Sequence, residues 1–324
     1  MTELIQLQDI EAARAALPSY IRRTPIVPLA RESSEIGAEK LFLKCENLQV
    51  TGAYKVRAAS TMLNALADAE RARGVVLTSS GNFAQAFAYA GRSLNVPITV
   101  VMLDHTSAYK VAATKGHGAD VYLCGTDALQ RQPTVRRLAT ERGLIAIDTW
   151  EEPPITAGHG SIGLEIVEDF EEVEQVLVPV SSGGVAAGIA TAVKERRPDI
   201  KVIGVQPERA NAAYVSLERG EPTAIDYWDT IADGLSAVRP GEFPFRHLQR
   251  YLDDIVLIRE VDIANAFGTL LTRAKLLGEP AGVVAAAAFL AGKVDPSLTT
   301  VAALTGGNLT PNVMQHLLDM AETE

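Results

Sequence analysis

Lys55 is the residue of this chain best placed to do covalent chemistry. It follows a strand-like run at residues 41–43 and a Thr51-Gly52 turn, and it stands at the start of a helical stretch. Burial and the positive end of a helix both disfavour an ammonium group, so we expect a depressed pKa for this lysine. A neutral amine is what a lysine needs to form an imine with an aldehyde cofactor. Taken alone, however, a lysine is more often a solvated surface residue.

Three further segments end strand-like runs in small polar residues and glycine. They are Ser79-Ser80-Gly81-Asn82-Phe83-Ala84-Gln85, Ser181-Ser182-Gly183-Gly184-Val185 and Thr305-Gly306-Gly307-Asn308. An apolar run precedes each of them, and a helical pattern follows at least the first two. Open α/β sheets bind their ligands at such strand–turn–helix connections, so these segments are the candidate binding loops.

The lysine segment and the three loops, in this order, resemble the fold-type II pyridoxal-phosphate enzymes, and most of all the threonine/serine dehydratase and serine racemase family. The resemblance covers essentially the whole chain. It implies an α/β fold with two open, mostly parallel twisted sheets and helices on both faces. Residues 1–72 and 148–324 would form a large cofactor-binding domain, and residues 73–147 a small inserted domain that closes over the substrate. The cofactor, pyridoxal 5'-phosphate, would lie in the cleft between them.

The resemblance also implies roles for single residues around the cofactor. Lys55 would hold it and then move the Cα proton of the substrate, and Tyr54 would be a further cofactor contact. The loop from Ser181 to Val185 would bind the phosphate through backbone N–H groups at a helix N-terminus, although two serines stand where the family usually has glycine. The other implied cofactor contacts are Asn82 at the 3-oxygen of the ring, Gly234, Glu279, and Thr305 at the pyridine nitrogen.

The loop at residues 79–85 matches the segment that binds the substrate carboxylate in the family. The implied substrate contacts are Ser79, Ser80, Gly81 and Gln85. Ser80 also matches the acid/base of racemising relatives, but a hydroxyl at this position can equally bind only carboxylate. Phe83 departs from the usual histidine and could either reshape the pocket or simply pack.

Thr305 bears on the type of reaction. A neutral hydroxyl would not keep the pyridine nitrogen protonated as a carboxylate would, and this favours β-elimination or racemisation over transamination. We therefore predict an ammonia-lyase that converts a 3-hydroxy amino acid, such as L-threonine or L-serine, to a 2-keto acid and ammonia. A racemase, a dehydratase for 3-hydroxyaspartate, phenylserine or another catabolic intermediate, and a non-catalytic amino-acid-binding protein remain alternatives.

A metal site and a dinucleotide site are not expected. Where metal-dependent relatives present carboxylates, this chain has Gln206 and Ala212, with only Glu208 between them. The five histidines are spread out and read as surface or packing residues. Residues 158–163 spell a dinucleotide fingerprint, but the preceding run is acidic and contains prolines, whereas the fingerprint requires a buried strand.

Bulk properties fit a globular enzyme. The chain has 324 residues, 47% of them hydrophobic and 22% charged, and a net charge of −10 that argues against nucleic-acid binding. The N-terminal residues lack a secretory pattern, and the longest apolar stretch, residues 282–292, is too short to span a membrane. Cys45 and Cys124 show no paired spacing. We expect a cytoplasmic homo-oligomer, dimer or tetramer, that acts on a small-molecule amino acid and has no regulatory module.

Short β-rich runs alternate with longer helical patterns along the whole chain, which predicts βαβ units and parallel sheets. The expected strands cover residues 75–78, 98–102, 120–123, 176–180, 202–205 and 300–304. The expected helices cover residues 53–68, 83–94, 108–116, 127–142, 161–170, 185–196, 263–277, 281–291 and 311–321.

Overall fold

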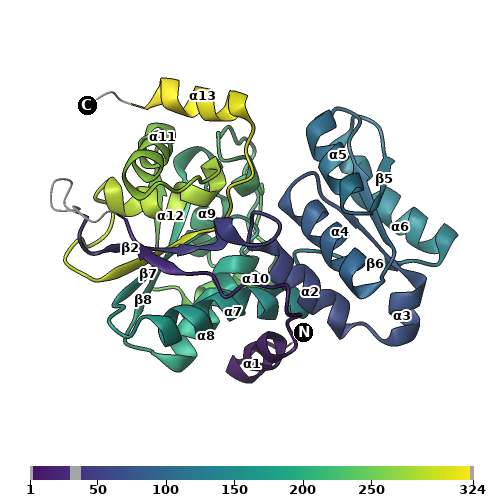
Figure 1. The fold of residues 1–324 in the computed structure, drawn as a ribbon, viewed down its shortest axis with the longest axis horizontal. Helices are drawn as coiled ribbons and strands as arrows, with labels where there is room; N and C mark the ends of the chain where they lie inside the picture. Colours follow the sequence, from purple (N-terminus) through teal and green to yellow (C-terminus); the bar gives the residue numbers. More distant parts are fainter. Residues whose placement is uncertain (1–2, 30–37, 322–324) are drawn as a thin grey trace.

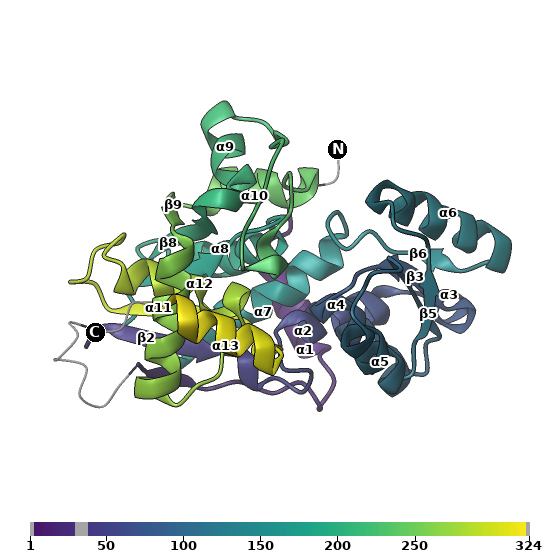
Figure 2. The ribbon, with the colours of Figure 1, turned by 90° about the horizontal axis from the view of Figure 1, so that it is seen from above.

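The computed structural model describes residues 3–29 and 38–321. The chain forms two lobes that lie side by side, each built on its own β-sheet (Figures 1 and 2). The larger lobe holds a six-stranded sheet in the order β1-β2-β10-β7-β8-β9, and the smaller lobe holds a four-stranded sheet in the order β5-β4-β3-β6. The predicted α/β fold with two open, mostly parallel sheets is confirmed.

The six-stranded sheet brings together segments from both ends of the chain. Its strands are β1 (Ile26–Pro28), β2 (Leu41–Cys45), β10 (Thr300–Leu304), β7 (Gln175–Pro179), β8 (Lys201–Pro207) and β9 (Asp254–Ile258). All neighbouring pairs are parallel except β1 with β2. The carboxyl ends of the five parallel strands therefore meet at one edge, where α/β sheets place their ligands.

The four-stranded sheet is formed by one continuous part of the chain. Its strands are β3 (Val75–Thr78), β4 (Ile98–Met102), β5 (Asp120–Leu123) and β6 (Ile145–Ala146), all parallel. They lie within the predicted small domain, residues 73–147. The boundaries of that domain stay a prediction.

Helices cover both faces of each sheet. The α-helices are α1 (Leu7–Ala15), α2 (Lys55–Ala65), α3 (Asp68–Arg73), α4 (Asn82–Leu94), α5 (Ala108–Gly116), α6 (Arg131–Arg142), α7 (Pro153–Asp169), α8 (Gly184–Arg196), α9 (Ala212–Arg219), α10 (Glu242–Tyr251), α11 (Glu260–Thr269), α12 (Pro280–Leu290) and α13 (Pro311–Met320). A π-helical turn at Leu270–Ala274 extends α11, and short 3₁₀ turns include Glu208–Ala210 and Asp233–Leu235.

Alternating side chains direct each strand toward two cores. Leu177 of β7 packs with α11 and α12, whereas Val176 and Val178 pack with α7, α8 and α10. In the small lobe, Leu77 of β3 faces α2 and α4, and Val76 faces α6. Each such buried aliphatic side chain contributes about 1.5–3 kcal/mol, so the hydrophobic pattern alone fixes which face each helix covers.

The start of α7 corrects one predicted boundary. This helix begins at Pro153 and not near residue 161. A proline fits the first turn of a helix because the backbone N–H that it lacks would have no acceptor within the helix at that position. The fingerprint-like residues 158–163 thus lie inside a helix. Their glycines serve close packing: a Cβ atom at Gly158 would lie 2.8 Å from the Cα atom of Ala58 in α2.

Other boundaries differ by less. The strands β1, β6 and β9 were not predicted; β1 and β6 are runs of three and two residues, which carry almost no periodic signal. The first predicted helix starts two residues later, at Lys55, and ends at Ala65. The predicted helix at residues 263–277 is α11 followed by the π-helical turn.

A buried ion network holds α2 against α7 and the lysine segment. The Arg57 guanidinium, 0% exposed, pairs with Glu46 at 2.9 Å and with Glu165 at 2.7 Å. Lys44, equally buried, contacts Glu165 at 2.6 Å. Burial alone would raise the pKa of Glu46, but Arg57, Thr24 and Lys44 together hold it below its usual value. These charges are all paired, and Arg57 lies two residues after Lys55.

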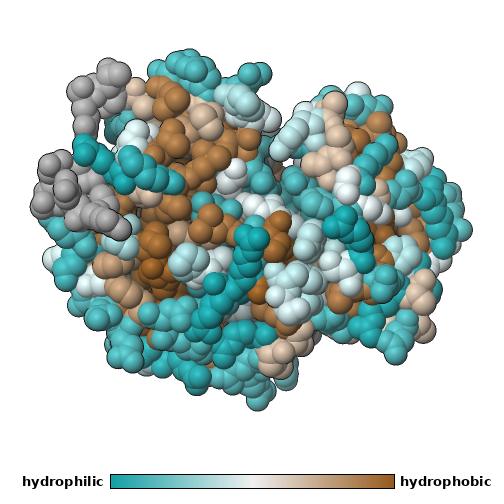
Figure 3. All heavy atoms as spheres, in the orientation of Figure 1, coloured by the Kyte–Doolittle hydropathy of each residue, from teal (hydrophilic) through white to brown (hydrophobic). Residues whose placement is uncertain are grey.

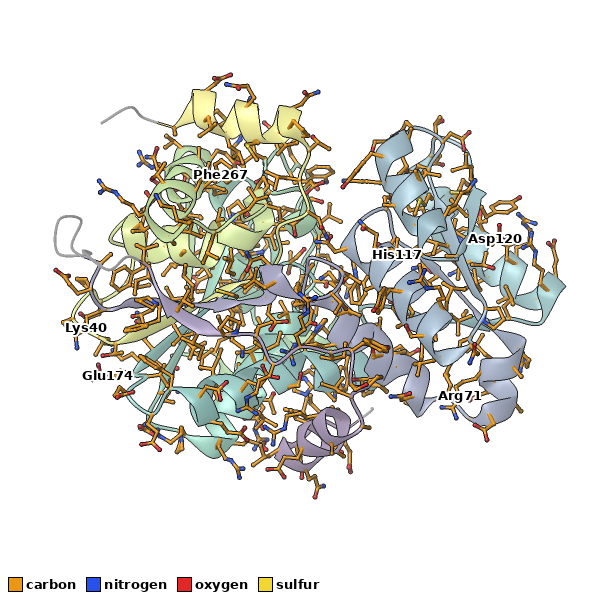
Figure 4. All side chains as sticks on the ribbon, viewed as in Figure 1. Lys40, Arg71, His117, Asp120, Glu174 and Phe267 are labelled. Atoms are coloured by element: carbon orange, nitrogen blue, oxygen red, sulfur yellow. The ribbon has the colours of Figure 1, made fainter. Side chains whose placement is uncertain are left out.

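The surface is hollowed between the two lobes, as Figure 3 shows. In Figure 4, Lys40 and Glu174 lie at the end of the large lobe remote from Arg71, His117 and Asp120 of the small lobe. Within the described residues, none of the helices combines the length and apolar character needed to cross a bilayer.

Candidate active site

The lysine segment and the C-terminal glycine loop are joined by backbone hydrogen bonds. The N–H of Tyr54 donates to the carbonyl of Thr305 at 3.0 Å, and the N–H of Gly307 donates to Gly52 at 2.9 Å. Ala53 and Gly306 form an isolated antiparallel bridge. These contacts follow from the pairing of β2 with β10, which brings the carboxyl ends of the two strands together.

Lys55 is the first residue of α2 and is half-buried. Its Nζ atom contacts the hydroxyl of Tyr54 and lies 4.1 Å from the Tyr54 ring centroid and 4.6 Å from that of Phe83. Burial among these rings lowers the pKa of Lys55 to about 7, although Glu279 acts in the opposite direction. This lowering has the direction predicted from the sequence, and it favours the neutral amine relative to a solvated lysine.

Asn82 and Glu279 connect the two lobes next to this lysine. The Asn82 amide, at the start of α4, donates to Glu279 Oε1 at 2.6 Å, and Asn308 donates to Asn82 Oδ1 at 2.9 Å. Burial and the nearby Asp233 raise the pKa of Glu279 to about 7, against the lowering effect of Asn82 and Lys55. Two groups whose pKa values are shifted to about 7 therefore interact electrostatically, a pattern typical of functional sites.

The predicted substrate loop lies at the carboxyl end of β3. Ser79, Ser80 and Gly81 are half-buried, and Gly81 precedes the first residue of α4. The N–H of Gly81 donates to Ser79 Oγ at 3.3 Å. Gln85 lies in the first turn of α4 and is half-buried as well. The positive end of α4 thus points into the region between the lobes, where it can attract a carboxylate.

The predicted phosphate loop joins β7 to α8. Gly183 has a φ of +105°, and a Cβ atom there would lie 3.2 Å from Leu248 and from Pro244, so only glycine fits. No side chain of the described residues caps α8, so its first N–H groups are available to an anion. Two backbone N–H groups of another segment hydrogen-bond this loop. That of Gly241 donates to the Ser182 carbonyl at 2.9 Å, and that of Ala237 donates to Ser181 Oγ at 3.3 Å. The two serines that replace glycines are compatible with this turn.

The remaining predicted contacts surround the same region. Thr305 is buried at the end of β10, and its backbone is bonded to Tyr54. Gly234 is in the 3₁₀ turn Asp233–Leu235, where a Cβ atom would lie 3.0 Å from Ala281 of α12. Asp233 also forms a 2.9 Å ion pair with Lys110 of α5, which links the large lobe to the small one. The structure thus gathers the predicted residues at one junction between the lobes.

Two residues of this junction were not singled out as site residues from the sequence. Asn308, within the glycine loop, bridges Asn82 and the Thr51 carbonyl. His159, expected to be a surface or packing residue, is 1% exposed in α7, with its ring 4.8 Å from that of Tyr54 and 5.9 Å from that of Phe83. The sequence places Asn308 in a candidate binding loop but gives it no role, and no local signal identifies His159, because it reaches the junction through the packing of α7.

The segment after β8 differs from a metal-binding loop in its chemistry. The Gln206 side chain closes a turn, since its Nε2 donates to the Ala210 carbonyl at 3.1 Å and its Oε1 accepts from Tyr214 at 2.8 Å. Glu208 is exposed and Ala212 is buried. Gln206 is therefore engaged within the loop on both of its polar atoms.

Comparisons with known proteins agree with this geometry. A profile of the family described as "Pyridoxal-phosphate dependent enzyme" matches residues 17–306. The chain is 37% identical over 328 residues to the catabolic L-threonine dehydratase TdcB of Staphylococcus aureus, covering 99% of this chain and 95% of that protein. The processed threonine deaminase isoform 2 of Solanum lycopersicum has a TM-score of 0.92 at 29% identity, covering 99% and 98% of the two chains.

Maize serine racemase has the same TM-score, 0.92, at 28% identity and 97% coverage of each chain. The resemblance inferred from the sequence is confirmed, and so is the cofactor that it implied. The chain belongs to the family of pyridoxal-phosphate dependent enzymes.

Proposed function

We propose that this enzyme eliminates water from a 3-hydroxy amino acid, such as L-threonine or L-serine, and releases a 2-keto acid and ammonia. The observation that carries the proposal is Lys55, a lysine whose pKa is lowered to about 7 and whose Nζ atom lies 4.6 Å from the ring of Phe83, in the loop predicted to bind the substrate carboxylate. The similarity to enzymes named threonine dehydratase and threonine deaminase supports the same reaction.

The residues present fit pyridoxal phosphate. The glycine-only turn at Gly183 and the free N-terminus of α8 suit its phosphate, and Lys55 suits its aldehyde. Asn82 and Glu279 would face one side of its ring, and Thr305 and Gly234 would complete the contacts. When bound, the cofactor accepts the electron pair left at Cα after the proton is removed.

The chain's own groups would then divide the remaining work. The neutral amine of Lys55 takes the Cα proton of the substrate and returns protons at the end of the reaction. Ser79, Ser80, Gly81 and Gln85 hold the carboxylate at the N-terminus of α4. The proton removed from Cα balances the one that the β-hydroxyl gains as it leaves as water, and the enamine product then takes up one water to give the keto acid and ammonia. Closure of the predicted small domain, residues 73–147, would exclude bulk water.

Racemisation is the second candidate, because Ser80 stands where racemising relatives have an acid/base and a serine racemase shares the fold. One experiment separates the candidates. Purified enzyme is incubated with a panel of 3-hydroxy amino acids, and the keto acid, the ammonia and the enantiomer of the amino acid are measured together. Keto acid and ammonia in equal amounts support elimination. Formation of the opposite enantiomer without keto acid supports racemisation. Absence of product with every amino acid of the panel would support a non-catalytic binding protein.

The rate at which the apoprotein captures its cofactor should rise with pH through about 7 and level off above it. Burial lowers the pKa of Lys55 to about 7, and only the neutral amine attacks an aldehyde. A solvated lysine, with a pKa of about 10.4, would instead give a rate that keeps rising beyond pH 9. Stopped-flow absorbance on mixing apoprotein and cofactor distinguishes the two profiles.

Turnover should persist after removal of divalent cations. Hard cations need charged oxygen ligands, and the polar atoms of Gln206 already bond within their own loop. The measurement is a titration with EDTA in metal-free buffer. Loss of turnover that magnesium or calcium restores would contradict this assignment, whereas a small change in thermal stability without a change in rate would not.

The proposal extends to a cytoplasmic homo-oligomer, either a dimer or a tetramer. Cys45 and Cys124 are both free thiols, as is usual for proteins of a reducing compartment. Sedimentation equilibrium of the purified enzyme measures the oligomeric state, and a monomer at micromolar concentration would remove this part of the proposal.

A further inference from the structure

Tyr54 is held in a fixed position directly before Lys55. Its N–H donates to the Thr305 carbonyl at 3.0 Å, and its own carbonyl accepts from the N–H of Arg57 at 3.1 Å. Its side chain is buried and packs in the core formed by β7, α7 and α8. Because neighbouring elements hold both the backbone and the ring, the hydroxyl of Tyr54 has little freedom to move.

This hydroxyl is directed at the amine of Lys55. The Nζ atom contacts the hydroxyl oxygen and lies 4.1 Å from the centroid of the Tyr54 ring. Each of the two groups is the other's one hydrogen-bond partner within residues 3–29 and 38–321. The phenol is therefore bonded to the atom that has to form the imine and move the proton, and to nothing else that the structure describes.

Tyr54 stays protonated over the pH range in which Lys55 changes its charge. Burial and the nearby Glu279 raise the pKa of Tyr54 above its usual value, whereas burial lowers the pKa of Lys55 to about 7. A neutral amine can accept a hydrogen bond from the phenol, and an ammonium can donate one to the phenolic oxygen. The bond to the ammonium is the stronger of the two because it is charge-assisted.

The other groups around the amine leave this role to Tyr54. Glu279, the residue before α12, raises the pKa of Lys55 through its charge. His159 of α7 faces the Tyr54 ring, but burial and nearby cations hold its pKa well below its usual value, so its ring is neutral. Phe83 of α4 presents an apolar ring 4.6 Å from Nζ. Among the described residues, Tyr54 is thus the polar group in direct contact with the amine.

We propose that the Tyr54 hydroxyl is the positioning group of Lys55, donating a hydrogen bond to the free amine and accepting one from the ammonium that forms when Lys55 takes the Cα proton. The inference rests on the role proposed above for Lys55 in the elimination. The proton passes from Cα to Nζ, the electron pair stays on the substrate, and Tyr54 keeps its own proton. Tyr54 acts through Lys55, in addition to the predicted contact of its ring with the cofactor.

Tyr54→Phe removes the hydroxyl and keeps the packed ring. The rate at which apoprotein captures pyridoxal phosphate is measured against pH by stopped-flow absorbance for the native chain and the variant. Without the phenolic oxygen the ammonium loses the stronger bond, so the pKa of Lys55 falls and the midpoint moves to lower pH. Hydrogen bonds to charged groups exceed neutral ones by about tenfold in an equilibrium constant, so we expect a shift of about one pH unit.

Tyr20→Phe is the matched control. The Tyr20 hydroxyl lies 3.0 Å from Ser60 Oγ, so this change also removes a hydrogen bond of α2, but one away from Lys55. It should leave the midpoint unchanged. The same comparison in a Glu279→Gln background removes the other charge that acts on the amine, and the shift should persist. An unchanged midpoint in Tyr54→Phe, or a shift that disappears with Glu279→Gln, would overturn the inference.

Steady-state kinetics test the same bond in the loaded enzyme, with the amino acid found in the product screen. We expect Tyr54→Phe to lower kcat by about tenfold and to change KM by less than about twofold, because the amine is less well placed while the carboxylate loop is intact. A native kcat would contradict the proposal. The capture measurement needs no substrate, so failure of the proposed elimination and failure of this inference are seen separately.

Discussion

Replacement of Lys55 by alanine should lower turnover by at least about 10²–10⁴-fold, the range expected when a positioned proton-transfer group is removed. The loss should lie at the upper end, since this one amine would both hold the cofactor and move the Cα proton. The absorbance band of the lysine-bound cofactor should disappear with it. Steady-state kinetics with the amino acid found in the product screen, and the visible spectrum of the same sample, are the two measurements.

Lys115→Ala is the matched control for this change. Lys115 is an exposed lysine of α5, so its removal should leave both the spectrum and the rate unchanged. If Lys55→Ala retained the absorbance band, or kept a tenth of the native rate, the cofactor would be attached elsewhere and the assignment of the site would fail.

Arg57→Met should give the largest loss of stability, about 3–5 kcal/mol in the free energy of unfolding. Methionine fills the space of the side chain but leaves the buried Glu46 without the cation that it pairs with, and leaves Glu165 with Lys44 alone. Removing one partner of a buried ion pair costs this much stability because the other charge stays buried without an opposite charge beside it. Urea-induced unfolding, followed by circular dichroism, measures the difference.

The pH dependence of this loss has a definite sign. Arg57 holds the pKa of Glu46 below its usual value, so the stability that the pair provides is present above pH values of about 4 and is lost as the pH falls through the folded-state pKa. The difference between Arg57→Met and the native chain should therefore be largest at neutral pH and shrink in acid.

Arg137→Met supplies the comparison at the surface, where Arg137 pairs with Glu141 at 2.8 Å and both side chains are about half exposed. Exposed pairs contribute roughly 0–1 kcal/mol. A loss at Arg57 no larger than the one at Arg137 would show that the interior tolerates the unpaired carboxylates.

Much of the fold follows from local patterns. The strands at residues 75–78, 98–102, 120–123 and 300–304 coincide with β3, β4, β5 and β10, because apolar runs bounded by turn residues carry a strong signal. Of the three unpredicted strands, β1, β6 and β9, the first two are too short for any period and exist only because a neighbouring strand provides their hydrogen bonds. The prolines at the start of α7 suggest a helix break when the local sequence is considered alone, but in the folded chain they occupy the first turn of the helix.

The candidate site divides in the same way. The glycine loops stand out in the sequence because small polar residues and glycine follow strand-like runs, and Lys55 stands out because it follows such a run and a turn. The partners of His159, Asn308 and Arg57 could not be read from the sequence, since only tertiary structure supplies them. The direction of the Lys55 pKa shift was predictable from a buried helix start, whereas Glu279 as its charged neighbour was visible only in the folded chain.

The position of β10 has a consequence for how the enzyme is made. This strand, residues 300–304, lies between β2 and β7, so the large sheet has a gap in its middle until these residues have left the ribosome. The four strands of the small lobe, residues 75–146, are contiguous and can pair much earlier during synthesis. Since Gly306 must also bridge to Ala53, a nascent chain that still lacks residues 300–306 should be unable to take up its cofactor.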